Sequence, residues 1–321
     1  MGQCASASRG AAAADDDDAA RRRRRHGADD ASTTTGARVS ALTKTTRPLR
    51  ERYAYVDKLG HGAFGEVYAY ASTTGTGDVA VKALDKQKLS RIRTSGGRTM
   101  MDDAVDEAEL MSLCADAHVV GVYEWCEDAR ENKAYIVMEF CERGALLGDD
   151  TDGFEPFEDS RVKAVIRDLL SALVVCHARG VVHYDVKPQN ILVSASGAHK
   201  LGDFGSARRV EKNEHDGTYA LVRTTPGTPA FTAPECCEGE PCDGFKADVW
   251  AVGVTAHALA TGSYAYRAEG AWNTYQMILE RDVDLSQISN QQCRNFLEAV
   301  LDRDPSSRLT AQQALEHAWL A

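Results

Sequence analysis

The residues best suited to chemistry lie in one short stretch, residues 183–190 (HYDVKPQN), which is followed thirteen residues after Asn190 by residues 203–205 (DFG). Asn190 and Asp203 offer an amide oxygen and a carboxylate, which are ligands that Mg²⁺ accepts, and Asp185 can take the proton of an attacking hydroxyl. A polar turn is the alternative interpretation. The combination predicts metal-assisted phosphoryl transfer.

A glycine-rich run, residues 60–67 (GHGAFGEV), precedes this stretch. Glycines let backbone N–H groups approach phosphates without a Cβ clash. The run alone would also fit an ordinary hairpin, but it is followed by a strand-like stretch and not by the helix of a dinucleotide-binding fold. Fifteen residues after Val67, an apolar strand ends at Lys82. That lysine could merely reach surface water, but paired with the loop it can hold the phosphates of ATP.

Together and in this order, the motifs resemble a eukaryotic protein kinase over residues 53–320. The resemblance implies that ATP and Mg²⁺ are the cofactors, that Asp185 is the catalytic base, and that Asn190 and Asp203 hold the metal. It further implies two catalytic lysines: Lys187, which steadies the transferred phosphate, and Lys82, which anchors the nucleotide. The residues expected to bind the nucleotide are Gly60, His61, Gly62, Ala63, Phe64, Gly65, Val67, Ala80, Lys82, Glu139, Cys141 and Leu192.

The resemblance also assigns partners to several of these residues. The helix partner of Lys82 should be Glu107 and not Glu109. Glu107 is followed by Leu110 and Met111, and when Glu107 is aligned with the family's glutamate, no gap is needed before residues 119–120. The supporting positions are Met138 as gatekeeper, Glu235 with Arg308 as its buried partner, and Asp248 as the central-helix brace of the catalytic loop. Ala145 stands where many kinases place a ribose-binding acid.

Two matches and one departure narrow the family. Thr228 resembles the small residue of Ser/Thr kinases, and residues 227–237 (GTPAFTAPECC) are similar to the calcium/calmodulin-dependent protein kinase kinases, especially to plant relatives that activate AMP-activated-type kinases. Tyr184 replaces the usual arginine of the catalytic loop, so it cannot pair with a phosphorylated activation segment. The alternatives are a calcium-dependent-kinase relative that lacks EF-hands and a pseudokinase scaffold. The six catalytic and metal positions are all filled, which favours the enzyme.

The elements that must position these residues run from strands to helices. Strands are predicted at residues 53–56, 65–70, 78–83 and 135–140, and helices at 101–114, 161–179, 247–261, 290–301 and 311–320. Residues 247–261 are apolar on nearly all sides, which predicts a buried central helix. This order indicates the α+β class. With the resemblance, it implies a bilobal kinase fold with a β-rich N-lobe (53–139), a hinge (139–143) and a helical C-lobe (144–320).

Charge and composition limit the partners. The 321 residues carry a net charge of −11, which argues against a nucleic-acid partner. Residues 1–50 hold ten Lys/Arg and six Asp, a net charge of +4, and have no aromatic residue, so we expect a disordered tail. No run of about 18 apolar residues and no signal peptide are present. Protein substrates, including other kinases' activation loops, remain the expected partners.

The tail begins Met-Gly-Gln-Cys, which matches an N-myristoylation pattern at Gly2 with Cys4 placed for palmitoylation. One acyl chain binds membranes only marginally, so a second chain or the basic run Arg21–Arg25 would be needed. An unmodified tail or a nuclear signal is the alternative. We expect a cytoplasmic protein that associates with membranes through this tail.

Two further patterns in the sequence bear on calcium binding and on the state of the cysteines. Residues 148–153 mimic an EF-hand loop, but Gly148 at its first position has no ligand side chain. No calmodulin-binding segment is evident after the last predicted helix. The nine cysteines are odd in number, and several lie in apolar runs, which predicts free, buried thiols in a reducing compartment. The cluster Cys236, Cys237 and Cys242 lacks a second ligand pair at zinc spacing.

Overall fold

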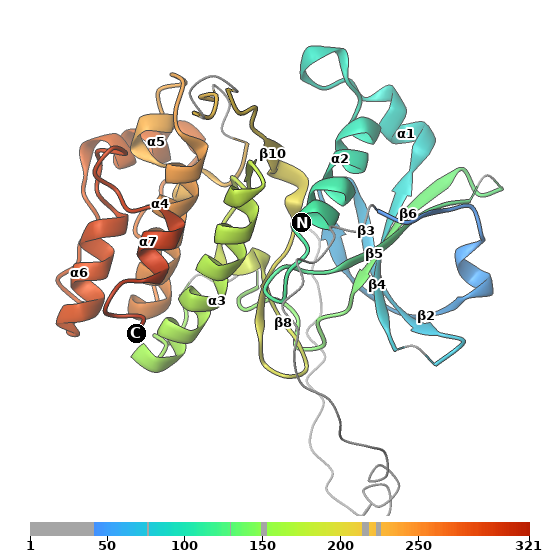
Figure 1. Ribbon diagram of the computed structural model, residues 1–321, viewed down its shortest axis with the longest axis horizontal. Helices are drawn as coiled ribbons and strands as arrows, with labels where there is room; N and C mark the ends of the chain where they lie inside the picture. The colour runs from blue at the N-terminus through green and yellow to red at the C-terminus, as the bar shows by residue number, and fades with distance from the viewer. Residues whose placement is uncertain (1–41, 76, 129, 149–152, 214–217, 223–225) are drawn as a thin grey trace, which may run out of the picture. The chain divides into compact units, whose positions relative to one another are not determined.

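The computed structural model describes residues 42–321, except residues 76, 129, 149–152, 214–217 and 223–225. The lipidation motif, the Arg21–Arg25 run and the core of the EF-hand-like loop therefore lie outside the described residues. The first part of the described chain builds a β-sheet and the rest is mainly helical (Figure 1).

A six-stranded sheet forms the N-lobe, with the strand order β1-β5-β6-β4-β3-β2. All neighbouring pairs are antiparallel except β1 with β5. β4 lies in the middle and is buried on both faces apart from its last residue and Ala83, which explains its nearly continuous apolar sequence. The strands are β1 (Lys44–Thr45), β2 (Tyr53–Gly62), β3 (Gly65–Ser72), β4 (Val79–Asp85), β5 (Val122–Asp128) and β6 (Lys133–Glu139).

Two helices, α1 (Lys86–Arg91) and α2 (Met100–Leu113), belong to the same part of the chain. α2 begins with a capping box, in which Thr99 and Asp102 bond each other's backbone N–H. Ala104 and Ala108 of α2 pack with Trp125 and Ile136 of the sheet. The C-terminal end of the helix, at Leu110 and Met111, instead joins the core of the helical part. α2 therefore connects two cores.

The C-lobe is built around α4 (Gly244–Thr261), in which fourteen residues are buried, including the central stretch from Ala247 to Leu259. α3 (Asp159–Ala178) packs beside it and is followed by Gly180 at φ 71°, a left-handed conformation that favours glycine. The remaining helices are α5 (Ala271–Glu280), α6 (Gln291–Val300) and α7 (Ala311–Leu315). Short strands complete the lobe: β7 (Val181–Val182) with β10 (Arg208–Arg209), and β8 (Ile191–Val193) with β9 (His199–Leu201). Among the described residues, none of the helices combines the length and the apolar character needed to span a bilayer.

The predicted α+β class with a β-rich N-lobe and a helical C-lobe is confirmed. The predicted disordered tail, 1–50, is too long. β1 pairs with β5, and Leu49 is only 4% exposed because it packs on the outer face of the sheet with Val79 and Tyr135. The burial of Leu49 offsets the conformational entropy that is lost when this otherwise polar segment is ordered.

Two element boundaries differ from the sequence prediction, and some whole elements were not predicted. β2 extends to Gly62, because Gly60–Gly62 pair with β3 and only residues 63 and 64 turn the hairpin. β5 and α5 were not predicted. The last helix ends at Leu315 and not at residue 320, since the chain tightens into turns with hydrogen bonds from His317 N to Ala314 O and from Leu320 N to His317 O.

We predict that Gly65→Ala destabilises the N-lobe, whereas Gly60→Ala does not. A Cβ at Gly65 would lie 2.0 Å from the carbonyl oxygen of Ala83, whereas at Gly60 nothing lies within 4 Å. Overpacking of this kind costs about 1–3 kcal/mol, so Gly65→Ala should lower the midpoint of thermal unfolding by several degrees. Differential scanning calorimetry of both variants measures this, and equal midpoints for the two would contradict it.

Candidate active site

A buried ion pair joins β4 to α2. Lys82 Nζ lies 2.7 Å from both carboxylate oxygens of Glu107, and the two side chains are 4% and 3% exposed. Burial raises the pKa of Glu107, which the Lys82 ammonium opposes. Glu109, the rival partner, instead forms an exposed ion pair with Lys44. The structure thus places Lys82 beside the acid that the family resemblance assigns to it.

Three side chains form a closed polar triangle in the catalytic loop and the segment after it. Asp185 Oδ1 accepts hydrogen bonds from the backbone N–H (2.9 Å) and the hydroxyl (2.7 Å) of Thr228. Lys187 Nζ lies 2.9 Å from Asp185 Oδ2 and donates to Thr228 Oγ1 at 2.7 Å. Burial would raise the pKa of Asp185, but Lys187 and Thr228 outweigh it and hold the pKa below its usual value. Asp185 is therefore an ionised acceptor.

Asn190 and Asp203 fit a hard cation. The amide nitrogen of Asn190 donates to the carbonyl (2.7 Å) and the carboxylate (2.9 Å) of Asp185, which leaves the amide oxygen of Asn190 as its acceptor. Asp203 adopts a left-handed backbone, with φ 54°, and its carboxylate accepts one bond from Gly205 N at 3.3 Å. Both residues line the same cleft as Lys82. Two such oxygens suit Mg²⁺ that is also held by phosphates.

That cleft has a volume of about 610 Å³ and combines groups from both lobes. Of the predicted nucleotide residues, ten line it: Gly60, His61, Gly62, Ala63, Val67, Ala80, Lys82, Glu139, Cys141 and Leu192. Phe64 and Gly65 do not. Gly65 belongs to the sheet, whereas Phe64 at the hairpin tip turns toward Gly205 and Lys82, whose Nζ lies 5.2 Å from the ring centre.

The cleft also contains residues that the sequence analysis did not assign to the nucleotide. The main ones are Leu59, Met111, Val120, Gly144 and Gly202. They are apolar or backbone contributors from five different segments, and no local motif marks them. Gly62 shows why a glycine is needed in the cleft, since a Cβ there would lie 3.1 Å from Lys82 Cε and 3.3 Å from its Nζ.

Asp248 of α4 braces the catalytic loop from below and is only 1% exposed. Its carboxylate accepts bonds from the backbone N–H groups of His183 (2.9 Å) and Tyr184 (2.8 Å), and lies 2.9 Å from His177 Nε2. His183 in turn contacts Gly202 O through Nε2 and accepts from Asp185 N through Nδ1, which places its proton on Nε2. One buried carboxylate thus fixes the backbone on which Asp185 sits.

Tyr184 occupies space that two glycines leave open. Its backbone is left-handed, with φ 64°. A Cβ at Gly244 would lie 2.6 Å from the Tyr184 hydroxyl, and one at Gly227 would lie 2.3 Å from its carbonyl oxygen. The hydroxyl is buried and has no hydrogen-bond partner among the described residues, and burial raises its pKa, so the phenol stays neutral. The Tyr184 side chain itself therefore offers no positive charge to a phosphate.

Aromatic packing connects the segment after the DFG motif to the same brace. The ring of Tyr219 meets that of Phe245 edge-on at 4.8 Å, and Phe245 meets the ring of His177 at 4.9 Å. His177 contacts Asp248, as described above. Edge-to-face pairs contribute about 0.5–1.5 kcal/mol each beyond the area they bury. The segment is therefore anchored to the base of the catalytic loop by uncharged contacts.

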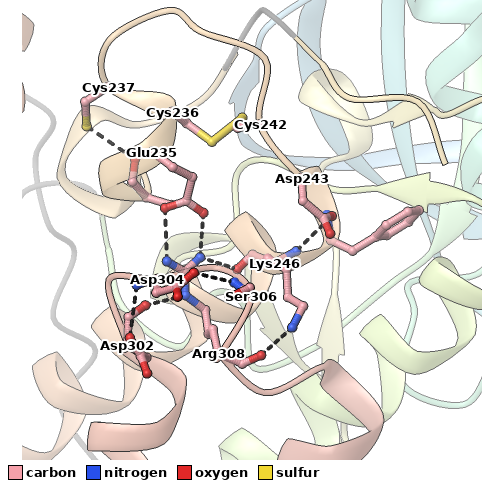
Figure 2. A network of polar contacts seen from close by, with 12 residues as sticks. Glu235, Cys236, Cys237, Cys242, Asp243, Lys246, Asp302, Asp304, Ser306 and Arg308 are labelled. Carbon is pink, nitrogen blue, oxygen red and sulfur yellow. Dashed lines mark hydrogen bonds and ion pairs between the residues drawn. A yellow bond between two sulfur atoms is a disulfide. The ribbon is translucent and has the colours of Figure 1, made fainter. Parts of the chain in front are cut away.

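The end of this segment is held by an ion pair and a disulfide (Figure 2). Arg308, 1% exposed, donates to both carboxylate oxygens of Glu235 at 2.6 and 3.0 Å. Cys236 and Cys242 form a disulfide. The prediction of free thiols is therefore wrong for these two residues, because the fold brings them within bonding distance, while the other cysteines of the described residues are free.

Comparisons with known proteins agree with this geometry. The chain matches the family model for the protein kinase domain over residues 53–320. It is 34% identical over 263 residues to serine/threonine-protein kinase GRIK1 of Arabidopsis thaliana, covering 82% of this chain and 65% of that protein. Against serine/threonine-protein kinase GRIK2 of the same plant, it is 34% identical over 270 residues, which is 84% of this chain and 65% of the relative.

A third relative is CBL-interacting protein kinase 5 of Oryza sativa subsp. japonica, 32% identical over 278 residues, which are 87% of this chain and 58% of that protein. The chain thus spans less than two thirds of the length of these curated relatives. The predicted resemblance to eukaryotic Ser/Thr kinases is confirmed, and the chain belongs to the protein kinase family.

Proposed function

We propose that this protein is an ATP- and Mg²⁺-dependent protein kinase that phosphorylates serine and threonine residues. The observation that carries the proposal is the triangle of Asp185, Lys187 and Thr228 at the mouth of the cleft that holds Lys82 and Glu107. A pseudokinase would typically lack one of these groups or a metal ligand. Here the described residues supply all of them.

Each residue has a separate task in this mechanism. The Mg²⁺–ATP complex would supply the phosphoryl group, with Asn190 and Asp203 holding the metal and Lys82 the phosphates. Asp185, kept ionised by Lys187 and Thr228, would accept the proton of the substrate hydroxyl. Glu107 fixes the direction of Lys82 through two hydrogen bonds. The preformed contacts mean that little reorganisation is needed when the substrates bind.

The substrate class follows from the surroundings of Thr228. A second cavity, of about 410 Å³, adjoins the triangle and is lined by Lys187, Gln189, residues 228–231 and the start of α5. Gln189 is neutral and donates to the Tyr264 hydroxyl at 2.8 Å, so this wall offers no carboxylate to an arginine of the substrate. Together with the relatives named above, this favours activation segments of AMP-activated-type kinases as substrates.

The first residues of the chain bear on where the protein is located in the cell. Gly2 and Cys4 match the pattern for two acylations, and Arg21–Arg25 add attraction to anionic lipids. We therefore propose a cytoplasmic kinase that is recruited to membranes through its N-terminus.

Lys82→Met and Asp203→Asn should each lower the rate of γ-phosphate transfer at least about 100-fold, because a preorganised charge at the transferred group is lost. The assay uses radiolabelled ATP and an AMP-activated-type kinase domain as the acceptor. Circular dichroism should show an unchanged fold. Lys88→Met, which removes an exposed lysine of α1, is the matched control and should retain full activity. Wild-type rates in both test variants would refute the site assignment.

Removal of activation-segment phosphates should change the activity less than about tenfold, because Tyr184 cannot form the arginine–phosphate ion pair. The measurement is a kinase assay before and after phosphatase treatment, with a kinase that has the arginine as positive control. Thr224 and Thr225, outside the described residues, are the sites expected if modification occurs, and their double Ala variant should stay active. A hundredfold loss would show that Arg208, Arg209 or Lys212 binds the phosphate instead.

Gly2→Ala should move the protein from the membrane to the soluble fraction, since N-myristoylation requires that glycine. Fractionation of cells that express each form measures the distribution, and Gln3→Ala, which keeps the acceptor, is the control. Identical distributions of the wild type and Gly2→Ala would rule out the lipid anchor.

A further inference from the structure

The disulfide between Cys236 and Cys242 joins the end of the activation segment to the start of α4. Cys236 ends a short 3₁₀ helix (Pro234–Cys236), and Cys242 directly precedes Asp243, the N-cap residue of α4. Their Cα atoms are 5.7 Å apart, and the two residues are only 3% and 4% exposed. The residues between them make a surface loop in which 238–240 are exposed. The bond therefore closes a small ring at the protein surface.

Both ends of this ring are also held by other contacts (Figure 2). On one side, Glu235 forms its two bonds with Arg308. On the other, the Asp243 carboxylate accepts from the backbone N–H groups of Phe245 (2.9 Å) and Lys246 (3.3 Å). These contacts do not depend on the disulfide. What the bond adds is a restraint on the loop and on the backbone of Cys242 itself.

The backbone of Cys242 is where the activation segment is attached. Val222 N donates to Cys242 O at 3.0 Å, and Cys242 N donates to Val222 O at 2.8 Å, as an isolated antiparallel bridge. Val222 lies three residues after Tyr219, which packs on Phe245. Val222, six residues before Thr228, is therefore bonded to a residue whose position is restrained by a covalent link.

The neighbouring Cys237 does not compete for this link. Its thiol donates to Ala233 O at 3.4 Å and is turned away from the disulfide (Figure 2). Burial raises the pKa of Cys237 to about 12, so it is a thiol and a poor attacking group. Cys236 and Cys242 can thus open and close as a defined pair.

We propose that Cys236 and Cys242 are a reversible redox modification site that controls the kinase through the Val222–Cys242 bridge. The proposal rests on the function proposed above. The reactant is a dithiol. One thiolate of the dithiol attacks one sulfur of the Cys236–Cys242 bond, which forms a mixed disulfide and releases the other cysteine. The second thiolate of the dithiol then attacks the dithiol's own sulfur in that mixed disulfide and displaces the remaining protein cysteine, so the reductant becomes a cyclic or intramolecular disulfide. The two electrons and two protons of the dithiol are thereby transferred to Cys236 and Cys242, which become thiols.

Reduction should loosen the activation segment without unfolding the lobe. The loop between the two cysteines regains freedom, and Val222 is then held by its two backbone hydrogen bonds and its partial packing against the core, without the covalent restraint on Cys242. The ends of the ring stay anchored through Arg308 and the cap of α4. The oxidised enzyme is therefore the more active form, because Thr228 and its contacts with Asp185 depend on an ordered segment.

The test uses the full-length protein, equilibrated with reduced or oxidised dithiothreitol, with the thiol state verified by alkylation and mass spectrometry. We expect phosphate transfer to fall at least fivefold on reduction and to recover on reoxidation. Amide hydrogen exchange at residues 219–222 should rise in parallel. Cys242→Ser should stay at the reduced level in both buffers, and Cys237→Ser, the matched control, should respond like the wild type. Cys236→Ala serves as the second variant if Cys242→Ser does not fold.

The outcomes separate this inference from the proposed function. If the fully reduced wild type transfers phosphate at the oxidised rate, with unchanged exchange at residues 219–222, the redox site is refuted and the kinase assignment stands. If Cys242→Ser still responds to dithiothreitol, another thiol is responsible and the inference also fails. If the oxidised wild type transfers no phosphate, the proposed function fails, while the exchange measurement still decides whether the disulfide orders the segment.

Discussion

The buried carboxylate of Asp248 is the interaction on which the catalytic loop depends. It is 1% exposed and receives hydrogen bonds from two successive backbone N–H groups, those of His183 and Tyr184, and a contact from His177. A charge in such a place is tolerated only when its acceptor positions are filled, and removal of one partner of a buried charge typically costs about 3–5 kcal/mol. The central helix α4 therefore sets the position of Asp185 by holding the backbone of the catalytic loop, and not by contacting the side chain of Asp185.

This dependence explains why an unusual residue is accepted beside the catalytic base. The left-handed backbone of Tyr184 directs its N–H at Asp248 and costs on the order of 1–3 kcal/mol for a residue with a Cβ. Gly244 and Gly227 remove the steric obstacles to its ring and carbonyl. The phenol then fills the position where the family usually places a cation. Order in this region comes from packing, with Tyr219 and Phe245 continuing the same contacts toward the activation segment.

The motif residues could be predicted from the sequence because each motif is local and its spacing is set by one loop or strand. Contacts between segments that lie far apart in the sequence could not be predicted in this way. Nothing near Tyr184 indicates that Gly244, sixty residues later, makes room for it, and the pairing of Cys236 with Cys242 depends on a fold that brings their Cα atoms to 5.7 Å.

One long strand of the main sheet was also missed. β5 carries Glu124 and Asp128, which are 8% and 3% exposed. Buried acids break the apolar alternation by which strands are recognised, and they are stable here because partners arrive from elsewhere in the fold, such as Arg52 beside Glu124.

The placement of α2 limits how such a kinase can be switched. Ala104 and Ala108 of this helix belong to the core under the sheet, whereas Leu110 and Met111 belong to the core of the helical lobe. Glu107 lies between them, so an outward movement of α2 would break the Lys82 pair and expose apolar surface in two cores at once. Burial of that surface is worth roughly 25 cal/mol per Å², which makes the inward position the stable one. The activation segment is attached less firmly at Val222, which is only partly buried against the core of the helical lobe and is paired with Cys242 through an isolated backbone bridge. The attachment of this segment is therefore a better candidate than the position of α2 for the control that we propose.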